Sequence, residues 1–318
     1  MTAFTAGVDL GGTKIQTVAV RDGRVVGSAR RPTPRTGAGD VVAAMAEMVK
    51  EAVSGANATL AELEGVGVGT PGQVDTAAGT VRAASNVPGF TDVVALGPEL
   101  SRAIGGHTVV LDNDVRMAML GEHKRGAGRP YSDFLGVFVG TGVGGGIVLG
   151  GELRRGRGTA GEIGHTVVRL GGRRCPCGRR GCLEAYAGRV ALEARARKRQ
   201  ARGQRTVLFH LMEKEGADRV TSGVIAQALK RGDALIAQLV EEAVEALGAG
   251  IASAQNLLDV EAVILGGGLP DKLGPAFVRR VEVAMQPHVF AVGRSPKVLP
   301  TELGDLSGAV GGAVAAGG

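Results

Sequence analysis

The sequence has no tryptophan and only two tyrosines and seven phenylalanines in 318 residues. This scarcity argues against the aromatic platforms on which proteins stack single-stranded nucleic acids. Cysteine is also scarce: the three cysteines all lie within residues 175–182, too few and too close together for a disulfide framework. The N-terminal segment MTAFTAGVD has no cationic stretch and no long apolar run, so we expect no secretory signal. Together these features predict a cytoplasmic protein.

Long hydrophobic segments are scarce as well. The charge-free window 134–151 has the 18 residues that a membrane-spanning helix needs at minimum, but eight of them are glycine. Such a glycine content disfavours a helix, so we expect no membrane association. Glycine is instead the abundant residue, at 54 of 318 positions, and it gathers in short runs that suit loops lying close to a ligand.

Basic charge is concentrated in one segment. The formal net charge is +6, yet residues 169–205 alone hold twelve Lys and Arg against two Glu. The arginine-rich part, 189–205, is compatible with a nucleic-acid patch or with the solvated face of an amphipathic helix. Binding an anionic phosphate donor such as polyphosphate is a third use. We favour the solvated face and expect no nucleic-acid partner.

The hydrophobic periodicity indicates an α/β protein. Two strand–glycine–strand units, at 6–20 and 134–149, suggest a duplicated architecture, and Asp22-Gly23 is expected to form a hairpin turn. Asp40 is the expected N-cap of the first helix. No Pro- or Ser-rich linker divides the chain, so we expect two domains that border a cleft. Further strands are expected at 65–69, 107–111 and 261–265, and helices at 40–56, 184–202, 221–231, 233–256, 271–286 and 306–316.

The segment Asp9-Leu10-Gly11-Gly12-Thr13-Lys14 places a carboxylate at the end of a strand and small residues in the turn that follows. Backbone N–H groups in such a turn can cradle phosphate, and the carboxylate can hold Mg²⁺ directly or through water. The segment is not a Walker A loop, because Lys14 follows Thr13 and leads into a strand rather than a helix. An ordinary hairpin turn is the alternative interpretation.

Two later glycine runs invite similar interpretations. Residues 140–146 contain a formal G-x-G-x-x-G, but a strand follows it instead of a helix, which excludes dinucleotide binding of the Rossmann type. A second phosphate-binding hairpin, with Gly140, Thr141 and Gly142, fits this position better. The run Gly266-Gly267-Gly268 is compatible with adenosine approaching the backbone at Gly267 or with a tight turn.

A possible metal site is formed by His165, Cys175, Cys177 and Cys182, which supply one imidazole and three thiols within 18 residues. Three thiolates and one imidazole are a known tetrahedral zinc set, and a fully ligated ion has a structural role. The alternative is that the cysteines are small buried hydrophobic residues without a metal. Because the rest of the chain has no cysteine, we predict structural Zn²⁺.

Three motifs in this order resemble the ROK family of sugar kinases and sugar-responsive repressors. The family's D-x-G-G-T-K corresponds to Asp9–Lys14, its G-E-x-G-H to Gly161–His165 and its C-x-C-G-x-x-G-C-x-E to Cys175–Glu184. The resemblance implies an actin-like, hexokinase-like (ribonuclease H-like) α/β fold with two domains around a cleft. We expect a small domain at 1–115, closed by a C-terminal helix at 303–318, and a large domain at 116–302 with the zinc-binding loop 165–184.

The resemblance also implies roles for individual residues. Asp114 matches the catalytic base, with Asp112 as the rival base and an N-cap as the other role open to Asp114. His165 would bind zinc through one ring nitrogen and face the sugar with the other. Arg116 departs from the small polar residue common in the family, so its role is open. Phosphate and nucleotide contacts fall on Asp9, Gly11, Gly12, Thr13, Lys14, Gly140, Thr141, Gly142 and Gly267, and sugar contacts on Gly72, Asn86, Asn113, Asp114, Glu162, His165 and Glu184.

The activity that the resemblance implies is phosphorylation of a hexose at its 6-hydroxyl by ATP with Mg²⁺, with glucose as the first candidate. N-acetylmannosamine, N-acetylglucosamine, mannose, fructose and allose are alternative sugars. A sugar-sensing repressor needs a helix-turn-helix domain ahead of the kinase-like part, and the early start of the first strand leaves no room for one. A non-catalytic sugar-binding protein is disfavoured because Asp9, Asp114 and the glycine runs are intact. The family further implies a homo-oligomer, either a dimer or a tetramer.

Overall fold

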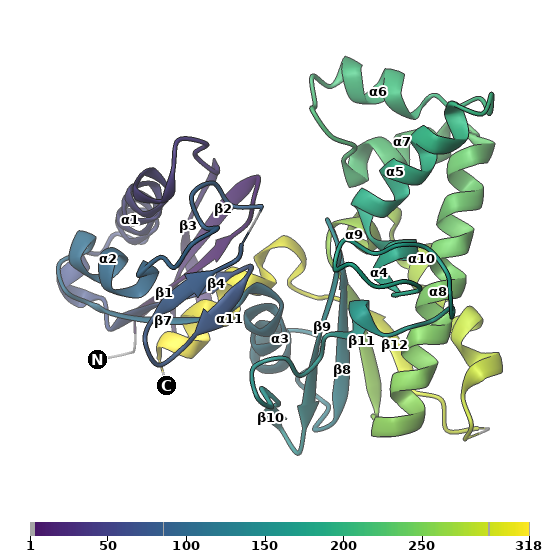
Figure 1. Cartoon of the computed structure of the whole chain (residues 1–318). Coiled ribbons are helices and arrows are strands. Elements are labelled where there is room, and N and C mark those ends of the chain that lie inside the picture. The colour runs from purple at the N-terminus through teal and green to yellow at the C-terminus, as the bar shows by residue number, and fades with distance from the viewer. Residues whose placement is uncertain (1–3, 85, 292, 318) are drawn as a thin grey trace. The chain divides into compact units, whose positions relative to one another are not determined.

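The chain folds into two compact units, which the computed structural model describes for residues 4–84, 86–291 and 293–317 (Figure 1). One unit runs to Pro130 and resumes at Thr301, and the other comprises Tyr131–Pro300. These boundaries differ from the predicted ones at 115 and 302. The reason is that helix α3 (Asp114–Arg125) packs against the C-terminal helix α11 (Ser307–Ala316), so both belong to the first unit.

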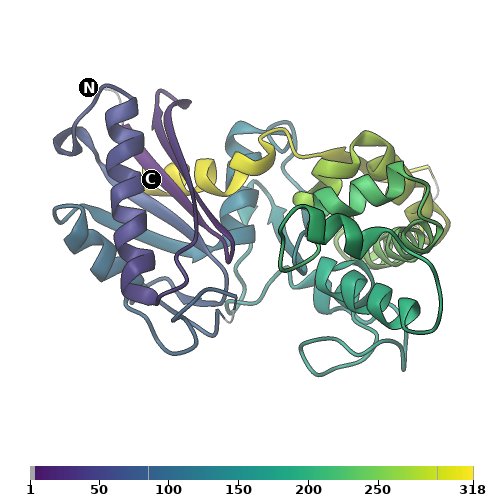
Figure 2. The same ribbon diagram turned by 90° about the horizontal axis from the view of Figure 1, so that it is seen from above.

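The first unit is built on a five-stranded sheet with the order β3-β2-β1-β4-β7. β1, β2 and β3 are antiparallel neighbours, whereas β4 and β7 run parallel to β1. Helices α1 (Ala38–Gly55) and α11 cover opposite faces of this sheet, as Figure 2 shows, and α2 (Leu96–Ala103) packs beside α1. The strands are β1 (Phe4–Leu10), β2 (Lys14–Arg21), β3 (Arg24–Pro32), β4 (Gly65–Thr70) and β7 (Thr108–Asn113).

The second unit repeats this topology with the strand order β10-β9-β8-β11-β12. β8, β9 and β10 are antiparallel neighbours, and β11 and β12 run parallel to β8. This is the arrangement of the first sheet, strand for strand, so the predicted duplication is confirmed. The strands are β8 (Phe134–Val139), β9 (Val143–Leu149), β10 (Glu152–Leu153), β11 (Ala262–Gly266) and β12 (Lys297–Pro300).

Helices make up most of the remaining second unit. They are α4 (Glu184–Ala187), α5 (Arg189–Gln200), α6 (Leu208–Lys214), α7 (Ser222–Lys230), α8 (Ala234–Leu258), α9 (Gly268–Leu273) and α10 (Pro275–Met285). Short elements complete the two units: the hairpin β5 (Gln73–Asp75) and β6 (Thr80–Arg82), and 3₁₀ turns at Leu60–Glu62, Ile163–His165, Gln286–His288 and Gly304–Leu306.

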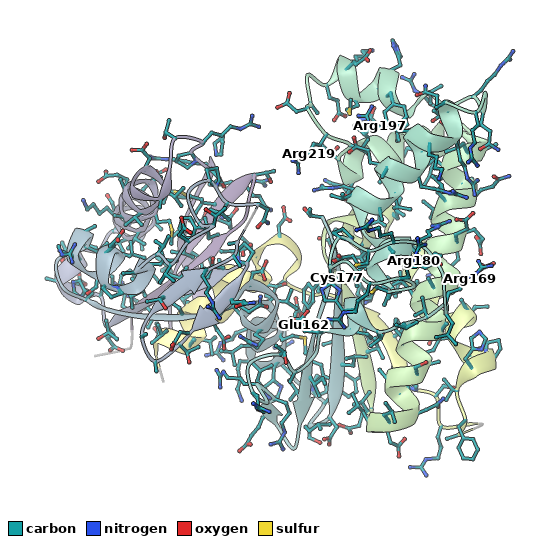
Figure 3. All side chains as sticks on the ribbon, viewed as in Figure 1. Glu162, Arg169, Cys177, Arg180, Arg197 and Arg219 are labelled. Carbon is teal, nitrogen blue, oxygen red and sulfur yellow. The ribbon has the colours of Figure 1, made fainter. Side chains whose placement is uncertain are left out.

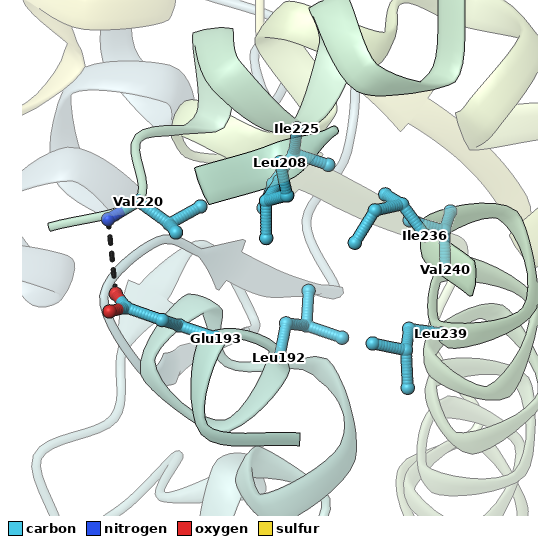
Figure 4. Close-up of a pocket in the computed structure, with 8 residues that line it drawn as sticks. All are labelled: Leu192, Glu193, Leu208, Val220, Ile225, Ile236, Leu239 and Val240. Carbon is cyan, nitrogen blue, oxygen red and sulfur yellow. Dashed lines mark hydrogen bonds between the residues drawn. The ribbon is translucent and has the colours of Figure 1, made fainter. Parts of the chain in front are cut away.

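A small cavity among α5, α6, α7 and α8 is lined by aliphatic side chains and one carboxylate, that of Glu193 (Figure 4). Glu193 accepts a hydrogen bond from the backbone N–H of Val220 at 3.0 Å and pairs with Arg197 at 2.7 Å. Because this carboxylate already has partners and the other lining groups are apolar, the cavity belongs to the helical core. It lacks the converging polar groups of a ligand site.

Much of the predicted local structure is confirmed. The two strand–glycine–strand units form as expected, and α7 occupies the expected helix 221–231. Asp22 and Gly23 have φ values of 52° and 71°, which are the positive values that a two-residue type I′ hairpin turn requires. Within the described ranges no helix is long and apolar enough to cross a membrane, and the window 134–151 is taken up largely by β8 and β9.

Three local predictions are wrong. Helix α1 begins at Ala38, so Asp40 lies in its first turn and is not the N-cap. The helix expected at 184–202 is divided into α4 and α5 at Gly188, whose backbone is extended with ψ 137°. The helix expected at 271–286 is likewise divided into α9 and α10 at Gly274, where φ is +74°. Both divisions occur at glycine, which has low helix propensity and tolerates such conformations.

Candidate active site

The carboxyl ends of three parallel strands gather acidic residues at one edge of the first sheet. β1, β4 and β7 are in register at Asp9, Gly69 and Asp112, and Asp114 follows β7 as the first residue of α3. In sheets of this kind the carboxyl edge is where ligands bind. The structure therefore brings the predicted Mg²⁺ ligand Asp9 and the predicted base Asp114 to the same edge.

Asn113, the residue between the two candidate bases, is the N-cap of α3. Its Oδ1 accepts hydrogen bonds from the backbone N–H groups of Val115 at 3.0 Å and Arg116 at 3.3 Å. The alternative role of Asp114 as the N-cap is therefore wrong, because Asn113 already satisfies the first N–H groups of the helix. Asp114 lies in the first turn, where the helix dipole favours an ionised carboxylate.

Asp112, the rival base, is engaged by Arg116. Its Oδ1 lies 2.5 Å from Arg116 Nε and accepts the N–H of Asn113 at 2.8 Å. Both members of this ion pair are buried, with 3% of the Asp112 side chain and 8% of the Arg116 side chain exposed. A carboxylate that is buried and held by a guanidinium is poorly suited to accept a substrate proton, so the geometry favours Asp114 as the base.

The ion pair yields a prediction for stability. Replacing Arg116 with methionine removes the cation that pairs with the buried Asp112, and we expect the free energy of unfolding to fall by about 3 kcal/mol. The double variant Asp112→Asn/Arg116→Met has no charge left to bury and should recover most of that loss. Urea denaturation of the wild type, both single variants and the double variant measures this. Equal losses for the single and the double variant would contradict the pairing.

Asp9 is a strongly perturbed carboxyl group at this edge. Burial, and after it the neighbouring Asp114, raises the pKa of Asp9 to about 7, although Lys14 acts in the opposite direction. Two carboxylates in a desolvated position repel each other, and a divalent cation between them would remove that cost. The donor chemistry at Asp9 therefore fits Mg²⁺.

The same pKa predicts how stability depends on pH. The folded protein holds the Asp9 proton up to about pH 7, whereas the unfolded chain releases it near 3.8, so this group makes stability fall as pH rises between those values. Asp9→Asn should therefore stabilise the ligand-free protein more at pH 8 than at pH 5, by about 2 kcal/mol. Denaturation at both pH values without added Mg²⁺ measures the difference, with Asp92→Asn, an exposed carboxylate, as the control. An equal gain at both pH values would contradict the prediction.

The glycine turn between β1 and β2 is tightly packed. The hydroxyl of Thr33 donates to the carbonyl of Gly11 at 2.6 Å. A methyl group on Gly12 would lie 2.3 Å from the carbonyl oxygen of Asn86, so only glycine fits at this position. The predicted phosphate turn and the predicted sugar residue Asn86 are thus direct neighbours.

Two other predicted contacts in the first unit lie against neighbouring groups. Lys14 forms an ion pair with Asp305 at 2.9 Å, and a phosphate contact through Lys14 would have to compete with this carboxylate. Gly72 has φ +95°, and a methyl group there would lie 2.7 Å from the carbonyl oxygen of Arg82. Gly72 therefore shapes the chain where it enters the β5–β6 hairpin.

The second glycine turn, residues 140–142 between β8 and β9, is bordered by the start of α5. The backbone N–H groups of Arg189 and Val190 donate to the carbonyls of Gly140 at 3.0 Å and Thr141 at 3.2 Å. The guanidinium of Arg189 also donates to the hydroxyl of Thr141 at 2.8 Å. The break of the predicted long helix at Gly188 allows this contact, because α5 begins again directly against the turn.

Glu184, a predicted sugar ligand, connects this turn to the cysteine cluster. Its Oε2 accepts the N–H of Val143 at 3.0 Å, and its Oε1 lies 3.7 Å from Sγ of Cys175. A methyl group on Gly142 would lie 2.1 Å from Glu184 Oε2, so this close approach requires glycine in the turn. The structure thus brings three sequence-predicted groups of the second unit together.

The predicted metal ligands form one cluster. The ligand atoms of His165, Cys175, Cys177 and Cys182 all lie within 4.8 Å of one another. Sγ of Cys177 is 3.7 Å from Sγ of Cys182, and Sγ of Cys175 is 3.9 Å from Nδ1 of His165. A tetrahedral zinc ion with Zn–S bonds of about 2.3 Å holds its sulfur ligands about 3.8 Å apart. The spacing therefore fits zinc.

The surroundings of the thiols fit a cation as well. Burial raises the pKa of Cys175 to about 12 and also raises that of Cys182, whereas the backbone N–H of Arg179 lowers the pKa of the exposed Cys177. Buried thiols become thiolates when a metal ion compensates for their charge. Without an ion, burial would hold Cys175 and Cys182 in the protonated form.

The segment 161–165 packs directly on β9. A methyl group on Gly164 would lie 1.9 Å from the carbonyl oxygen of Val143. Nδ1 of His165 lies toward Cys175, so its Nε2 faces away from the cluster. Glu162 precedes the 3₁₀ turn and is exposed; Figure 3 labels it together with Cys177.

Gly267, the predicted nucleotide contact, lies in a tight turn between β11 and α9. Its φ is +90°, and a methyl group there would lie 2.8 Å from the carbonyl oxygen of Val139. Nearby, a methyl group on Gly268 would lie 3.2 Å from the hydroxyl of Ser222, which is buried and has no hydrogen-bond partner among the described residues. The sequence gives no signal for this position of Ser222, because a serine at the start of a helix resembles an ordinary cap.

Comparison with known proteins relates the sequence to one family. The sequence matches the ROK family over residues 5–317. The chain belongs to the ROK family. A glucokinase of Thermotoga maritima is 33% identical over 305 residues, covering 90% of this chain and 93% of that protein.

Two solved ROK structures resemble the chain over nearly its full length. A ROK hexokinase from Thermus thermophilus is 34% identical, with a TM-score of 0.79, and covers 98% of this chain and 97% of its own. A ROK family glucokinase from Streptomyces griseus, solved in complex with glucose and AMPPNP, is 33% identical, with a TM-score of 0.82, and covers 98% and 99%. Together with the duplicated sheets, these likenesses confirm the predicted actin-like, hexokinase-like α/β fold class.

Beyond the ROK motifs, the structure assigns contacts to residues that the sequence analysis did not single out. Glu122 of α3 is fully buried and accepts hydrogen bonds from the N–H of Leu303 at 3.0 Å and the hydroxyl of Ser307 at 2.7 Å. These contacts fasten α11 to the helix that begins with Asp114. These contacts of Glu122 could not be predicted from the sequence, because its partners lie about 180 residues away. The only local signal was an acidic residue on the apolar side of a helix.

Proposed function

We propose that this protein transfers the γ-phosphoryl group of ATP to the 6-hydroxyl group of glucose. The observation that carries the proposal is the location of Asp114 beside Asp9, at the edge of the sheet that also holds the first glycine turn. The likeness to ROK glucokinases, one of them solved with glucose and AMPPNP, supports both substrates. Other hexoses and N-acetylhexosamines are the alternative acceptors.

In the proposed reaction Asp114 accepts the proton of the 6-hydroxyl group while that oxygen attacks the γ-phosphorus in line. Phosphoryl transfer needs little covalent help from protein, so positioning and charge neutralisation supply most of the rate. Mg²⁺ held at Asp9 would neutralise charge on the phosphates when bound. The backbone N–H groups of Gly12 and Thr13 in the first glycine turn would bind the phosphates, whereas the N–H of Gly11 already donates to the carbonyl of Lys14 at 2.9 Å.

The polar residues predicted to bind the sugar differ in what they can offer. Asn113 uses Oδ1 to cap α3, so its amide nitrogen is the atom suited to donate to a sugar oxygen. Glu184 already accepts a hydrogen bond from the N–H of Val143 through Oε2, and the remaining lone pairs of its carboxylate can accept hydrogen bonds from sugar hydroxyl groups. The exposed Glu162 and Nε2 of His165 complete the set. Glu184 is half-buried, so an analogue that lacks the matching hydroxyl group would leave part of this carboxylate without a hydrogen bond, which favours a polyol.

We also propose that Cys175, Cys177, Cys182 and His165 hold a structural zinc ion. The ion would cross-link the loop before α4, and it has no open coordination position for chemistry when bound by four protein ligands. The spacing of the ligand atoms and the burial of two thiols support this assignment. By fixing Nδ1 of His165, the site would orient Nε2 toward the sugar.

The proposed function is tested by measuring ADP release with ATP and Mg²⁺ across a panel of sugars. The panel contains glucose, mannose, fructose, allose, N-acetylglucosamine and N-acetylmannosamine, and polyphosphate replaces ATP in a parallel series. We expect the highest kcat/KM with glucose and ATP. A higher kcat/KM with another sugar or donor would reassign the substrate, and no phosphorylation of any sugar would overturn the kinase assignment. The cytoplasmic location and the dimeric or tetrameric state stay predictions.

A further inference from the structure

Arg189 is the first residue of α5 and lies against the second glycine turn. Its Nη2 donates to the hydroxyl of Thr141 at 2.8 Å, and its own backbone N–H donates to the carbonyl of Gly140 at 3.0 Å. The side chain and the main chain of one residue therefore contact adjacent residues of the turn. These contacts hold the half-buried guanidinium beside residues 140–142.

The backbone of the turn is oriented by the same contacts. The carbonyl groups of Gly140 and Thr141 point toward the start of α5, where Arg189 and Val190 bind them. The N–H of Val143 points toward Glu184. The carbonyl groups of Gly140 and Thr141 thus already accept hydrogen bonds from the backbone of α5. Within the turn, the guanidinium of Arg189 donates to the hydroxyl group of Thr141.

The charges around Arg189 are unbalanced. Among the described residues no carboxylate forms an ion pair with Arg189. Glu193, the acid whose charge acts on Arg189, pairs with Arg197 at 2.7 Å and accepts a hydrogen bond from the N–H of Val220. Burial lowers the pKa of Arg189, and Arg219 lowers it further while Glu193 opposes both. Figure 3 labels Arg197 and Arg219 at the same end of the second unit.

A partly buried guanidinium without an acid partner is stabilised when an anion binds to it. Phosphate groups suit this position, because the planar fork of arginine matches their oxygens and the hydrogen bonds are charge-assisted. A nucleoside triphosphate is the anion that the proposed function brings to a turn of this kind. Glucose, which is neutral, would gain nothing from the charge.

We propose that Arg189 is a phosphate-contacting residue that binds the phosphates of the nucleotide donor together with residues 140–142. This inference rests on the proposed function and on the prediction from the sequence that the second glycine turn binds phosphate. Thr141 holds the guanidinium in place through its hydroxyl group. Arg189 thereby contributes to the choice of a triphosphate donor and leaves the affinity for the sugar unchanged.

The test compares Arg189→Gln, Arg189→Lys and the wild type in calorimetric binding of AMPPNP with Mg²⁺ and of adenosine. We expect Arg189→Gln to raise the Kd for AMPPNP about tenfold and to leave the Kd for adenosine, which has no phosphate, within about twofold. Arg189→Lys keeps the charge but loses the fork, so its Kd for AMPPNP should lie between the other two. If Arg189 only shaped the turn, Arg189→Gln would raise the Kd values for adenosine and AMPPNP by the same factor, and this result would overturn the inference. An unchanged Kd for AMPPNP would also overturn it.

Arg202→Gln is the matched control, because it removes the same charge from an exposed position just beyond the far end of α5, about 20 Å along the helix direction. Its Kd for AMPPNP should equal that of the wild type. Kinetics separates this inference from the proposed function. If wild-type protein phosphorylates glucose and Arg189→Gln binds AMPPNP normally, the inference alone fails. If no sugar is phosphorylated but the loss of AMPPNP affinity appears, the contact stands and the kinase assignment fails.

Discussion

Replacing Asp114 with asparagine is expected to lower kcat about 10³-fold, with the KM values for glucose and ATP changing less than about threefold. Asparagine has the size of aspartate but cannot accept the proton of the sugar hydroxyl group. The start of α3 should survive the change, because Asn113 supplies the cap. The loss should therefore fall on turnover, as measured by coupled detection of ADP release at saturating substrates.

The comparison with Asp112 makes this prediction specific. The double variant Asp112→Asn/Arg116→Met lacks the rival base and carries no unpaired buried charge, so we expect it to keep kcat within about tenfold of the wild type. Equal melting temperatures and equal AMPPNP affinity of Asp114→Asn and the wild type would exclude misfolding as the cause of a loss. An Asp114→Asn protein with more than a tenth of the normal kcat would reject Asp114 as the base.

The first glycine turn could be predicted because its signal is local. The run from Asp9 to Lys14 combines a strand end, two glycines and a strand start within six residues, and the structure has a strand, a turn and a strand there. The duplicated sheet followed from the same pattern at 134–149. Hydrophobic periodicity and glycine position are properties of short segments, so both can be recognised without knowledge of the tertiary contacts.

The division of labour among Asp112, Asn113 and Asp114 could not be predicted from the residues alone. The three residues are consecutive, and the side chain of each can cap a helix or bind a substrate. Their roles separate only because Arg116, one turn further along α3, turns back onto Asp112, and because Asn113 reaches the N–H groups ahead of it. The break of the helix at Gly188 could not be predicted either. Helix propensity is a local property, whereas the break allows α5 to begin against the turn at 140–142.

The cysteine cluster was predictable as a set, but its connection to the rest of the unit was not. Spacing and the absence of other cysteines point to His165, Cys175, Cys177 and Cys182, and their ligand atoms do converge. The contacts of Glu184 with Cys175 and Val143 bring the first residue of α4 to the first residue of β9, and the spacing of residues in the sequence does not reveal this. This contact gives a physical route by which the cluster could influence substrate binding.

Replacing Cys182 with serine is expected to abolish zinc binding and to lower the free energy of unfolding by more than about 5 kcal/mol. Cys182 is fully buried and pairs with Val167 across the loop that follows His165, a stretch with little regular structure of its own. Loss of the cross-link should also release His165 and Glu184, so the KM for glucose should rise at least about tenfold while kcat changes less. Elemental analysis, chemical denaturation and steady-state kinetics measure the three effects.

Cys177→His is the matched control for this experiment. Cys177 is the exposed member of the cluster, so an imidazole can be accommodated there, and two thiolates with two imidazoles still form a zinc site. This variant should retain zinc and most of the stability that Cys182→Ser loses. If freshly purified wild-type protein, kept reduced, contained no zinc and tolerated a chelator without loss of stability or glucose affinity, the cysteines would be packing residues. The raised pKa of Cys175 would then describe its resting state as a buried neutral thiol, and the orientation of His165 would depend on the packing of segment 161–165 against β9.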